Sequence, residues 1–304
     1  MKSVASIHFP QVVLSENGFQ LFNPVLKKRY KNRPEERVRL RWTEYLLHQS
    51  EVKRSRIGFE TPVHLRREEQ ALRADLVIYD HNFEPDMLVE CKAEQVRLSG
   101  KTAEQAARYN SKIKAPHLIL TNGVEDFRFE YRNGKIQKNS TPLPGSNPDR
   151  MISRNVIYWS ERGFCAPNPS GGIGPALAGI LDDFWNPEHA SHFRYLDFKK
   201  SPFPVPMNHY YRIFEFEEER KLAVTFSGHE EKGIYLIAVC NSGGKNDGLF
   251  SLNLEGFPIR NSPVLMTKEG SSKFHPDALD LFGFEEEGVF MSEKFAEALI
   301  RFFD

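Results

Sequence analysis

Two short apolar runs joined by a polar turn, then an amphipathic helix and a third apolar run, constrain the fold of this chain most strongly. The stretch "RADLVIYDHNFEPDMLVECKAE" (residues 73–94) predicts a strand, a tight turn and a second strand. The stretch "SGKTAEQAARYNSKIKAP" then predicts a helix from about Thr102 that ends before Pro116, and "HLILT" predicts a buried strand. A hairpin followed by a helical crossover predicts a mixed sheet covered by helices.

The residues before this stretch predict a short β element and one amphipathic helix. Asn17 and Gly18 lie between two apolar runs, and this pair tolerates the positive φ angles of a tight hairpin turn. In "RPEERVRLRWTEYLLH", Pro34 suits a first helical position, acids follow it, and apolar residues recur at helical spacing.

The 304 residues favour two domains. Ten of the 19 prolines lie between residues 142 and 206, where a helix near "ALAGILDDFW" is the one long element expected. Beyond them, apolar β-rich runs alternate with charged or Gly-rich turns, which predicts an antiparallel sheet and a closing helix. We therefore expect a first domain over residues 1–140, a Pro- and Gly-rich connector over 141–208, and a β-rich domain of unknown role over 209–304.

The net charge is zero, but it is unevenly distributed. Residues 27–73 contain 14 Lys and Arg side chains against seven Asp and Glu, whereas residues 205–304 contain ten against 17. The basic segment could face a polyanion such as DNA, and the acidic one could dock a protein partner. Solvated helix faces with a flexible basic loop are the simpler interpretation of the same counts.

The predicted hairpin brings two acids together. If its turn is centred on Asn82 and Phe83, Asp75 faces Glu90 across the strands, with about 5 Å between their Cβ atoms. Because side chains alternate along a strand, Lys92 shares the face of Glu90. The intervening side chains point to the other face: Met87, Val89 and Cys91.

Opposed carboxylates destabilise a sheet unless a cation neutralises them. A small set of oxygen ligands suits Mg²⁺ or Mn²⁺, which keep waters and take further oxygens from substrate phosphates. A lysine on the same face could polarise such a water and stabilise charge that grows on a phosphate. The hairpin therefore predicts a site for phosphodiester hydrolysis.

Asp75 followed after fourteen residues by Glu90-Cys91-Lys92 resembles the PD-(D/E)XK nuclease pattern. The segments "RPEERVR", "RADLVIYD", "MLVECKAE", "QAARYN" and "LILTNG" resemble, in this order, the N-terminal nuclease domain of type I restriction enzyme R subunits, the HsdR-like family. The resemblance covers roughly residues 20–135. It implies a restriction-endonuclease-like fold of the α/β (α+β) class, with a mixed sheet flanked by helices.

Carried over residue by residue, the resemblance implies metal ligands at Asp75 and Glu90 and a catalytic lysine at Lys92. Cys91 would be a further ligand through its backbone carbonyl, while its thiol is expected to lie in the core. Ala74 stands where the proline that gives the pattern its name would be, a departure that leaves the chemistry intact.

The same resemblance assigns two helical positions. Gln105 and Tyr109 match a QxxxY motif, which implies that they orient the site or contact the DNA backbone, although they could instead be a packed polar pair. Glu36 matches the acid of the first helix as a further metal ligand, with Glu35 as the competing candidate.

Other patterns carry less weight. "SGKT" at residues 99–102 lacks the glycine that a phosphate-binding loop requires, because Gln95 occupies that position, so we expect no translocating motor. His189 and His192 have no recognisable third ligand and are expected to be a surface pair. The three cysteines indicate neither a disulfide framework nor a zinc site.

The sequence thus predicts a Mg²⁺- or Mn²⁺-dependent DNA endonuclease without a motor. The alternative is a catalytically inactive nucleic-acid-binding or assembly protein on the same scaffold, and RNA stays open as a substrate. Cleavage of both strands would favour a homodimer. No signal peptide or long apolar stretch is present, so a cytoplasmic protein that does not enter membranes is expected.

Overall fold

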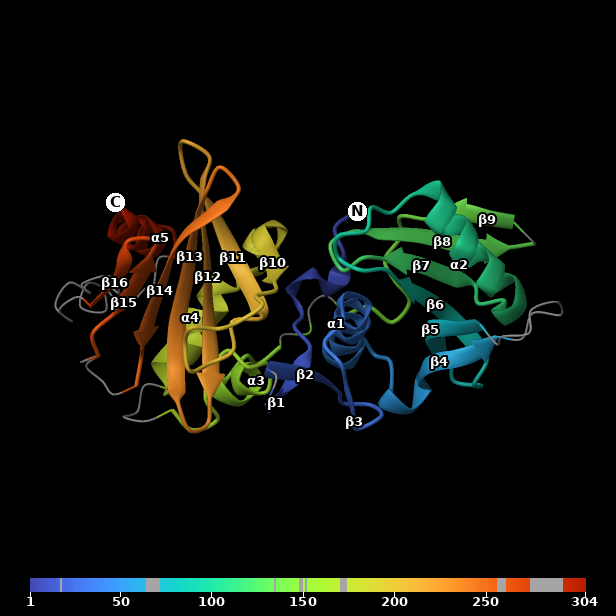
Figure 1. The fold of residues 1–304 in the computed structure, drawn as a ribbon. Coiled ribbons are helices and arrows are strands. Elements are labelled where there is room, and N and C mark those ends of the chain that lie inside the picture. Colours follow the sequence, from blue (N-terminus) through green and yellow to red (C-terminus); the bar gives the residue numbers. More distant parts are fainter. Residues whose placement is uncertain are drawn as a thin grey trace. The chain divides into compact units, whose positions relative to one another are not determined.

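A computed structural model describes most of the chain, and the residues it describes are 1–16, 18–63, 72–133, 135–147, 150, 152–169, 174–255, 261–273 and 292–304. Two compact units divide these residues. The first comprises Met1–Gln11 and Gln20–Ile152, and the second comprises Val12–Phe19 and Ser153–Asp304. Each unit has its own sheet (Figure 1).

The first unit is built on a six-stranded mixed sheet whose strand order follows the sequence. Its strands are β4 (Ile57–Val63), β5 (Leu72–Tyr79), β6 (Pro85–Cys91), β7 (His117–Thr121), β8 (Asp126–Arg132) and β9 (Lys135–Lys138). All neighbours pair antiparallel except β6 and β7, which are parallel and joined by helix α2 (Gly100–Ile113). The predicted mixed sheet flanked by helices is therefore confirmed.

Each face of this sheet has a helix in its core. On one face, Val38 and Trp42 of α1 (Pro34–His48) pack with strand residues that include Leu76 and Val89. On the other face, Ala106 and Tyr109 of α2 pack with residues that include Val77 and Leu88. Consecutive strand residues belong to different clusters because side chains alternate along a strand, so both faces of the central strands are buried.

Shorter elements complete the first part of the chain. They are η1 (Val4–Ile7), β1 (Gln11–Ser15), β2 (Gly18–Asn23), β3 (Lys28–Tyr30) and η2 (Arg54–Arg56), of which β1, β2 and β3 form a separate small sheet. Gly18 opens β2 with φ of 102°, a conformation that favours glycine, as the hairpin prediction requires. Asn17, the other residue of that prediction, lies outside the described residues.

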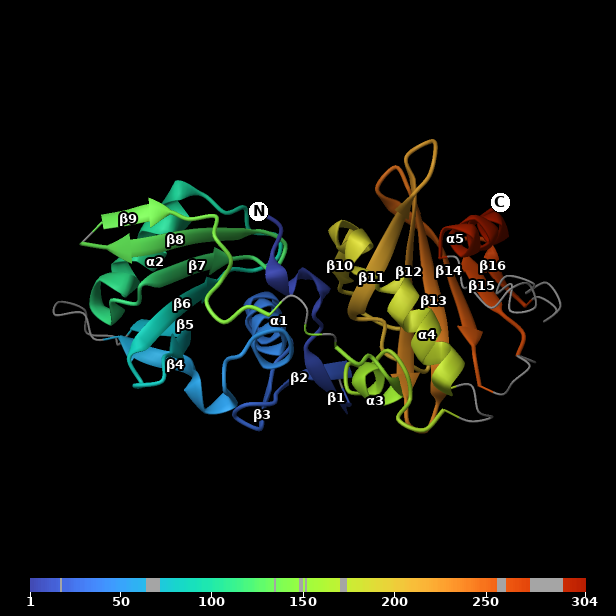
Figure 2. The ribbon, with the colours of Figure 1, turned by 180° about the vertical axis from the view of Figure 1, so that it is seen from behind.

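The second unit contains a seven-stranded antiparallel sheet, which confirms the predicted β-rich C-terminal part. Its strands are β10 (Phe193–Leu196), β11 (His209–Glu215), β12 (Arg220–His229), β13 (Gly233–Ser242), β14 (Lys245–Asn253), β15 (Val264–Thr267) and β16 (Gly270–Lys273). Its helices are α3 (Val156–Ser160), α4 (Gly174–Phe184), η4 (Pro187–His192), α5 (Ser292–Ile300) and η6 (Arg301–Phe303). Helix α4 covers one face of the sheet, in front of it in Figure 2 and behind it in Figure 1.

The segment expected to be a connector contributes to this second unit, which begins again at Ser153. It supplies α3, α4 and β10, and its aromatic side chains are buried. Trp159, Phe164 and Trp185 are each almost fully buried, and Phe164 contacts both tryptophans. Proline and glycine counts reveal breaks in regular structure, but they do not reveal whether the intervening aromatic residues enter a core.

Gly228 in β12 allows a close approach of two backbones. A Cβ atom added there would lie 2.0 Å from the carbonyl carbon of Cys165. We expect Gly228→Ala to lower the free energy of unfolding by about 3 kcal/mol, because backbone atoms cannot move aside as a flexible side chain can. Urea unfolding would measure the change.

Gly179 in the exposed part of α4 provides the matched control, because nothing lies within 4 Å of its added Cβ atom. Gly179→Ala should raise the stability by about 0.5–1 kcal/mol, the usual gain from removing an interior helical glycine. Equal effects of the two substitutions would contradict the packing argument.

Candidate functional site

The hairpin of β5 and β6 has the register predicted from the sequence. Leu76 pairs with Val89, and Ile78 pairs with Met87. The pairing extends as far as Leu76 and Val89, and beyond it the charge of Asp75 contributes to the raised pKa of Glu90. The Asp75 Oδ2 atom also accepts a hydrogen bond of 2.8 Å from the backbone N–H of Cys91, which fixes the carboxylate at this end of the hairpin.

The core residues of the hairpin follow the predicted alternation, but Asp75 departs from it, because its carboxylate pairs with Arg39 of α1, the helix on the face of Met87, Val89 and Cys91. Met87, Val89 and Cys91 lie in the core cluster that contains α1, whereas Val77 and Leu88 lie in the cluster that contains α2. Burial, followed by the charge of Asp75, raises the pKa of the Cys91 thiol well above its ordinary range. The thiol is therefore neutral, and the suggested role of the Cys91 carbonyl stays a prediction.

Glu90 and Lys92 form a close pair in a poorly solvated environment. The Lys92 Nζ atom lies 2.8 Å from Glu90 Oε1, and only 4% of the Glu90 side chain is exposed. The other carboxylate oxygen, Oε2, is buried and has no hydrogen-bond partner. Burial and the charge of Asp75 raise the pKa of Glu90 to about 7, although Lys92 opposes the shift.

Lys92 keeps its charge in this environment. Burial lowers the pKa of Lys92, but the charge of Glu90 and the hydrogen bond to it outweigh burial, so the pKa lies above its ordinary value. An ammonium group of this kind can neutralise an anion, but it cannot act as a base at neutral pH.

Arg39 is the functional residue that the sequence analysis missed. Its guanidinium lies 2.6 Å from Asp75 Oδ1 and 3.0 Å from Glu36 Oε1, with Glu60 Oε1 at 3.6 Å. Only 9% of the side chain is exposed. The signal available in the sequence was the spacing of Glu36 and Arg39, because residues three apart share one face of a helix.

Both candidate acids of α1 belong to the electrostatic environment of the site. Burial is the first cause that raises the pKa of Glu36; Arg39 opposes it, and the charges of Glu60 and Asp75 add to it. Glu35 is exposed, and its negative charge raises the pKa of both Glu90 and Lys92. The choice between Glu35 and Glu36 as a metal ligand stays a prediction.

Gln105 and Tyr109 contact each other on α2, since Gln105 Nε2 donates a hydrogen bond of 3.1 Å to the Tyr109 hydroxyl. Tyr109 is buried in the core beneath the helix. The packed polar pair is therefore present, and a contact of this pair with DNA stays a prediction.

The donor set around the hairpin suits a hard divalent cation. Within the described residues, no group of three or more His, Cys, Asp and Glu side chains is arranged to hold a metal ion. Glu90 Oε2 is an oxygen without a hydrogen-bond partner, whereas the two Asp75 oxygens already pair with Arg39 and with the Cys91 N–H, so a cation would have to share the Asp75 carboxylate with them. Mg²⁺ commonly uses one or two carboxylates together with waters and substrate phosphates, so the residues fit this cation chemically.

The remaining sequence patterns have structural explanations. Ser99 is the N-cap of α2, and its hydroxyl and that of Thr102 form a reciprocal capping box, so "SGKT" marks the start of a helix. His189 Nε2 lies 3.5 Å from Glu293 Oε1, which gives it a structural partner.

The first unit thus combines a mixed sheet that has one parallel crossover with two acids and a lysine near the end of its central hairpin. Residues 34–142 match the family model described as the type I restriction enzyme R protein N terminus. This part of the chain is similar to the N-terminal domain of type I restriction enzyme R proteins, which confirms the resemblance drawn from the sequence. Comparisons with curated proteins and with solved structures returned no significant match.

Among the helices in the described parts of the chain, none has both the length and the apolar character needed to cross a membrane.

Arg39→Met should destabilise the protein by roughly 3–5 kcal/mol, because it leaves a buried cluster of carboxylates without its shared cation. Chemical unfolding at pH 7.5 in EDTA would measure this loss. Arg33→Met, at the exposed N-cap of the same helix, is the control and should change stability little. Similar small losses in both variants would show that Arg39 does not hold the acids.

Proposed function

We propose that the first unit is a metal-dependent DNA endonuclease that hydrolyses phosphodiester bonds without a translocating motor. The observation that carries this proposal is the convergence of Asp75, Glu90 and Lys92 at one end of the hairpin. Within this set, Glu90 presents a buried oxygen without a hydrogen-bond partner. A buried acceptor of this kind is unfavourable in the isolated protein and becomes satisfied when a cation binds.

The three side chains would divide the chemistry. Asp75 and Glu90 would hold Mg²⁺ or Mn²⁺, and the bound cation would supply a Lewis acid that favours attack of water on phosphorus. Lys92 carries a positive charge beside Glu90 and can donate a hydrogen bond to a phosphate oxygen as negative charge grows there. Its raised pKa supports this electrostatic role rather than that of a general base.

Exposed basic side chains support binding to a polyanion. Lys28, Arg29 and Arg33 are exposed within the basic segment of residues 27–73. Not all of the segment's charge is available to DNA, because Arg37 and Arg39 are buried and ion-paired. The remaining exposed cations would contact the sugar–phosphate backbone, and this attraction weakens with salt.

A non-catalytic nucleic-acid-binding protein on the same scaffold is the second candidate. The observation that favours it is the ion pair between Arg39 and Asp75, which supplies a cation to this carboxylate from within the chain. Metal binding separates the two candidates, because the endonuclease requires a cation at Asp75 and Glu90.

Cleavage of supercoiled plasmid tests the proposed activity. We expect nicking in Mg²⁺ or Mn²⁺, none in EDTA, and a rate at least about 100-fold lower in Lys92→Ala, because the charge that stabilises the phosphate is lost. Asp75→Asn should also be inactive. Lys138→Ala, an exposed lysine on β9, is the control and should cut like the unmodified protein. Retained cleavage in purified, folded Lys92→Ala protein would contradict the assignment.

The pH dependence of stability tests the metal site without an activity assay. The pKa of Glu90 is about 7 in the folded protein against an ordinary value of 4.5. The folded state thus binds more protons between these values, and stability falls as pH rises through this window. Glu90→Gln abolishes this titration. The free energy of unfolding of the variant minus that of the unmodified protein should therefore rise by about 3 kcal/mol between pH 4.5 and pH 8.

The same variant reports on the cation. At pH 8, millimolar Mg²⁺ or Mn²⁺ should raise the melting temperature of the unmodified protein and leave that of Glu90→Gln unchanged, because ligands stabilise the state that binds them. Glu104→Gln, which removes an exposed carboxylate on α2, should respond like the unmodified protein. No response to either cation in the unmodified protein would favour the non-catalytic candidate.

A further inference from the structure

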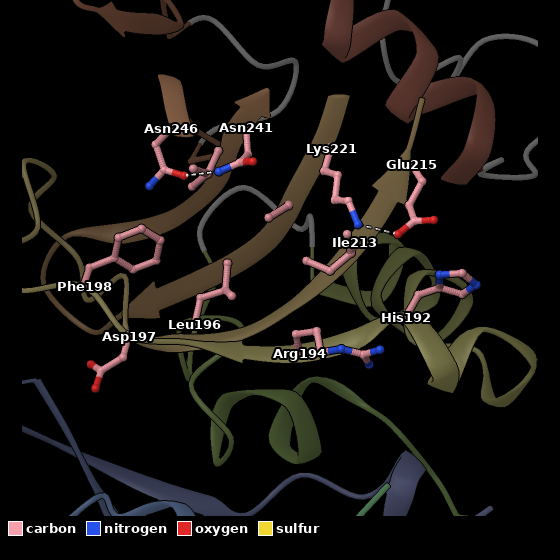
Figure 3. Close-up of a pocket in the computed structure, with 12 residues that line it drawn as sticks. His192, Arg194, Leu196, Asp197, Phe198, Ile213, Glu215, Lys221, Asn241 and Asn246 are labelled. Carbon is pink, nitrogen blue, oxygen red and sulfur yellow. Dashed lines mark hydrogen bonds and ion pairs between the residues drawn. The ribbon is translucent and has the colours of Figure 1, made fainter. Parts of the chain in front are cut away.

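The second unit contains a pocket of about 420 Å³ on the face of its sheet opposite α4 (Figure 3). Ala223 and Val239 line it, whereas Phe226, which follows Ala223 by an odd number of residues, contacts Phe184 of α4 on the other face. This volume lies within the range typical of small-molecule sites, about 300–1,000 Å³. The pocket is formed entirely by residues of the second unit.

The floor of the pocket is apolar. Ile213, Ala223 and Val239 stand side by side on β11, β12 and β13, since Ala223 pairs with both of the others. Leu196 and Phe198, from the end of β10 and the residues after it, form a wall beside this floor (Figure 3). Such a surface suits a flat, largely apolar group of about the size of a nucleobase.

A polar row borders this floor across four strands. The pairs are Glu215 with Lys221, Lys221 with Asn241, and Asn241 with Asn246. The Nδ2 atom of Asn241 donates a hydrogen bond of 2.9 Å to Asn246 Oδ1. The remaining Asn241 Oδ1 and Asn246 Nδ2 atoms, an acceptor and a donor, lie at opposite ends of this hydrogen-bonded pair.

The other side of the pocket is cationic. Lys221 Nζ lies 2.8 Å from Glu215 Oε1, and this hydrogen bond, followed by the charges of Lys221, His192 and Arg194, lowers the pKa of Glu215. In Figure 3 Lys221, Glu215 and His192 lie across the pocket from Phe198. On this side Glu215 is the one carboxylate beside Lys221, Arg194 and His192, whereas the second carboxylate of the lining, Asp197, lies on the opposite side near Phe198. The positive charge available to an anionic group of the ligand is therefore local to the side of Lys221 and Arg194.

We propose that this pocket binds a free nucleoside monophosphate. The base would lie on the apolar floor against Phe198 with its edge on Asn241 and Asn246, and the phosphate would lie near Arg194 and Lys221. A purely apolar ligand would make no use of the charged side of the pocket, and inorganic phosphate would leave the floor empty. The proposal does not depend on the nuclease activity of the first unit.

Isothermal titration of the full chain with each of the four common nucleoside monophosphates, in EDTA, tests this site. At least one should bind with a dissociation constant below about 1 mM, and its nucleoside and inorganic phosphate should each bind at least about tenfold more weakly. The proposal would be overturned if none of the four nucleoside monophosphates binds at concentrations up to about 5 mM.

Variants assign the binding to the pocket. Arg194→Gln should weaken the nucleotide about tenfold and leave the nucleoside unchanged, since it removes one charge from an exposed position. Asn241→Ala should change the preference among the four bases. Arg301→Gln, an exposed arginine outside the pocket, should bind normally.

Two results would assign the ligand elsewhere. Unchanged binding in both Arg194→Gln and Asn241→Ala would show that the nucleotide occupies another site. A 5′-phosphorylated tetranucleotide that binds tighter than every mononucleotide would identify a strand end as the ligand and overturn the assignment of a free nucleotide.

Discussion

The Arg39 guanidinium, shared among carboxylates in the interior of the first unit, is the interaction on which the candidate site depends. Without it, the mostly buried Asp75 and Glu36 would bring negative charge together beside the partly exposed Glu60. Each carboxylate comes from a different element, so the ion pairs also tie α1 to β4 and β5. Asp75, a metal ligand under the proposed function, is therefore neutralised by a cation of the chain itself.

Helix α1 combines this electrostatic role with a packing role. Val38 and Trp42 fill the core on one face of the sheet, while Arg37 bonds Glu94, which follows β6. The helix is thus fixed on its apolar and its charged sides, and Arg39 approaches the hairpin from a rigid support. Side chains placed by such support hold a reactive geometry better than side chains on loops.

The sequence determined the hairpin well because alternation and turn position depend on local residues. A register with Leu76 against Val89 follows directly from a turn near Asn82. Arg39 was missed because a charge count treats every arginine as solvated. The pocket of the second unit was missed because Lys221, Asn241 and Asn246 meet only through strand pairing, which no local pattern records.

The environment of Glu90 shows a conflict between stability and chemistry. Burial and the charge of Asp75 raise the pKa of Glu90 to about 7, so its ionised form is disfavoured at the pH of most cells. Lys92 offsets part of this penalty through its hydrogen bond of 2.8 Å to Glu90 Oε1, whereas Oε2 has no partner. Residues that weaken a fold locally without a structural benefit are characteristic of functional sites. The electrostatics of Glu90 therefore favour a site that becomes complete when a cation binds over an inherited scaffold.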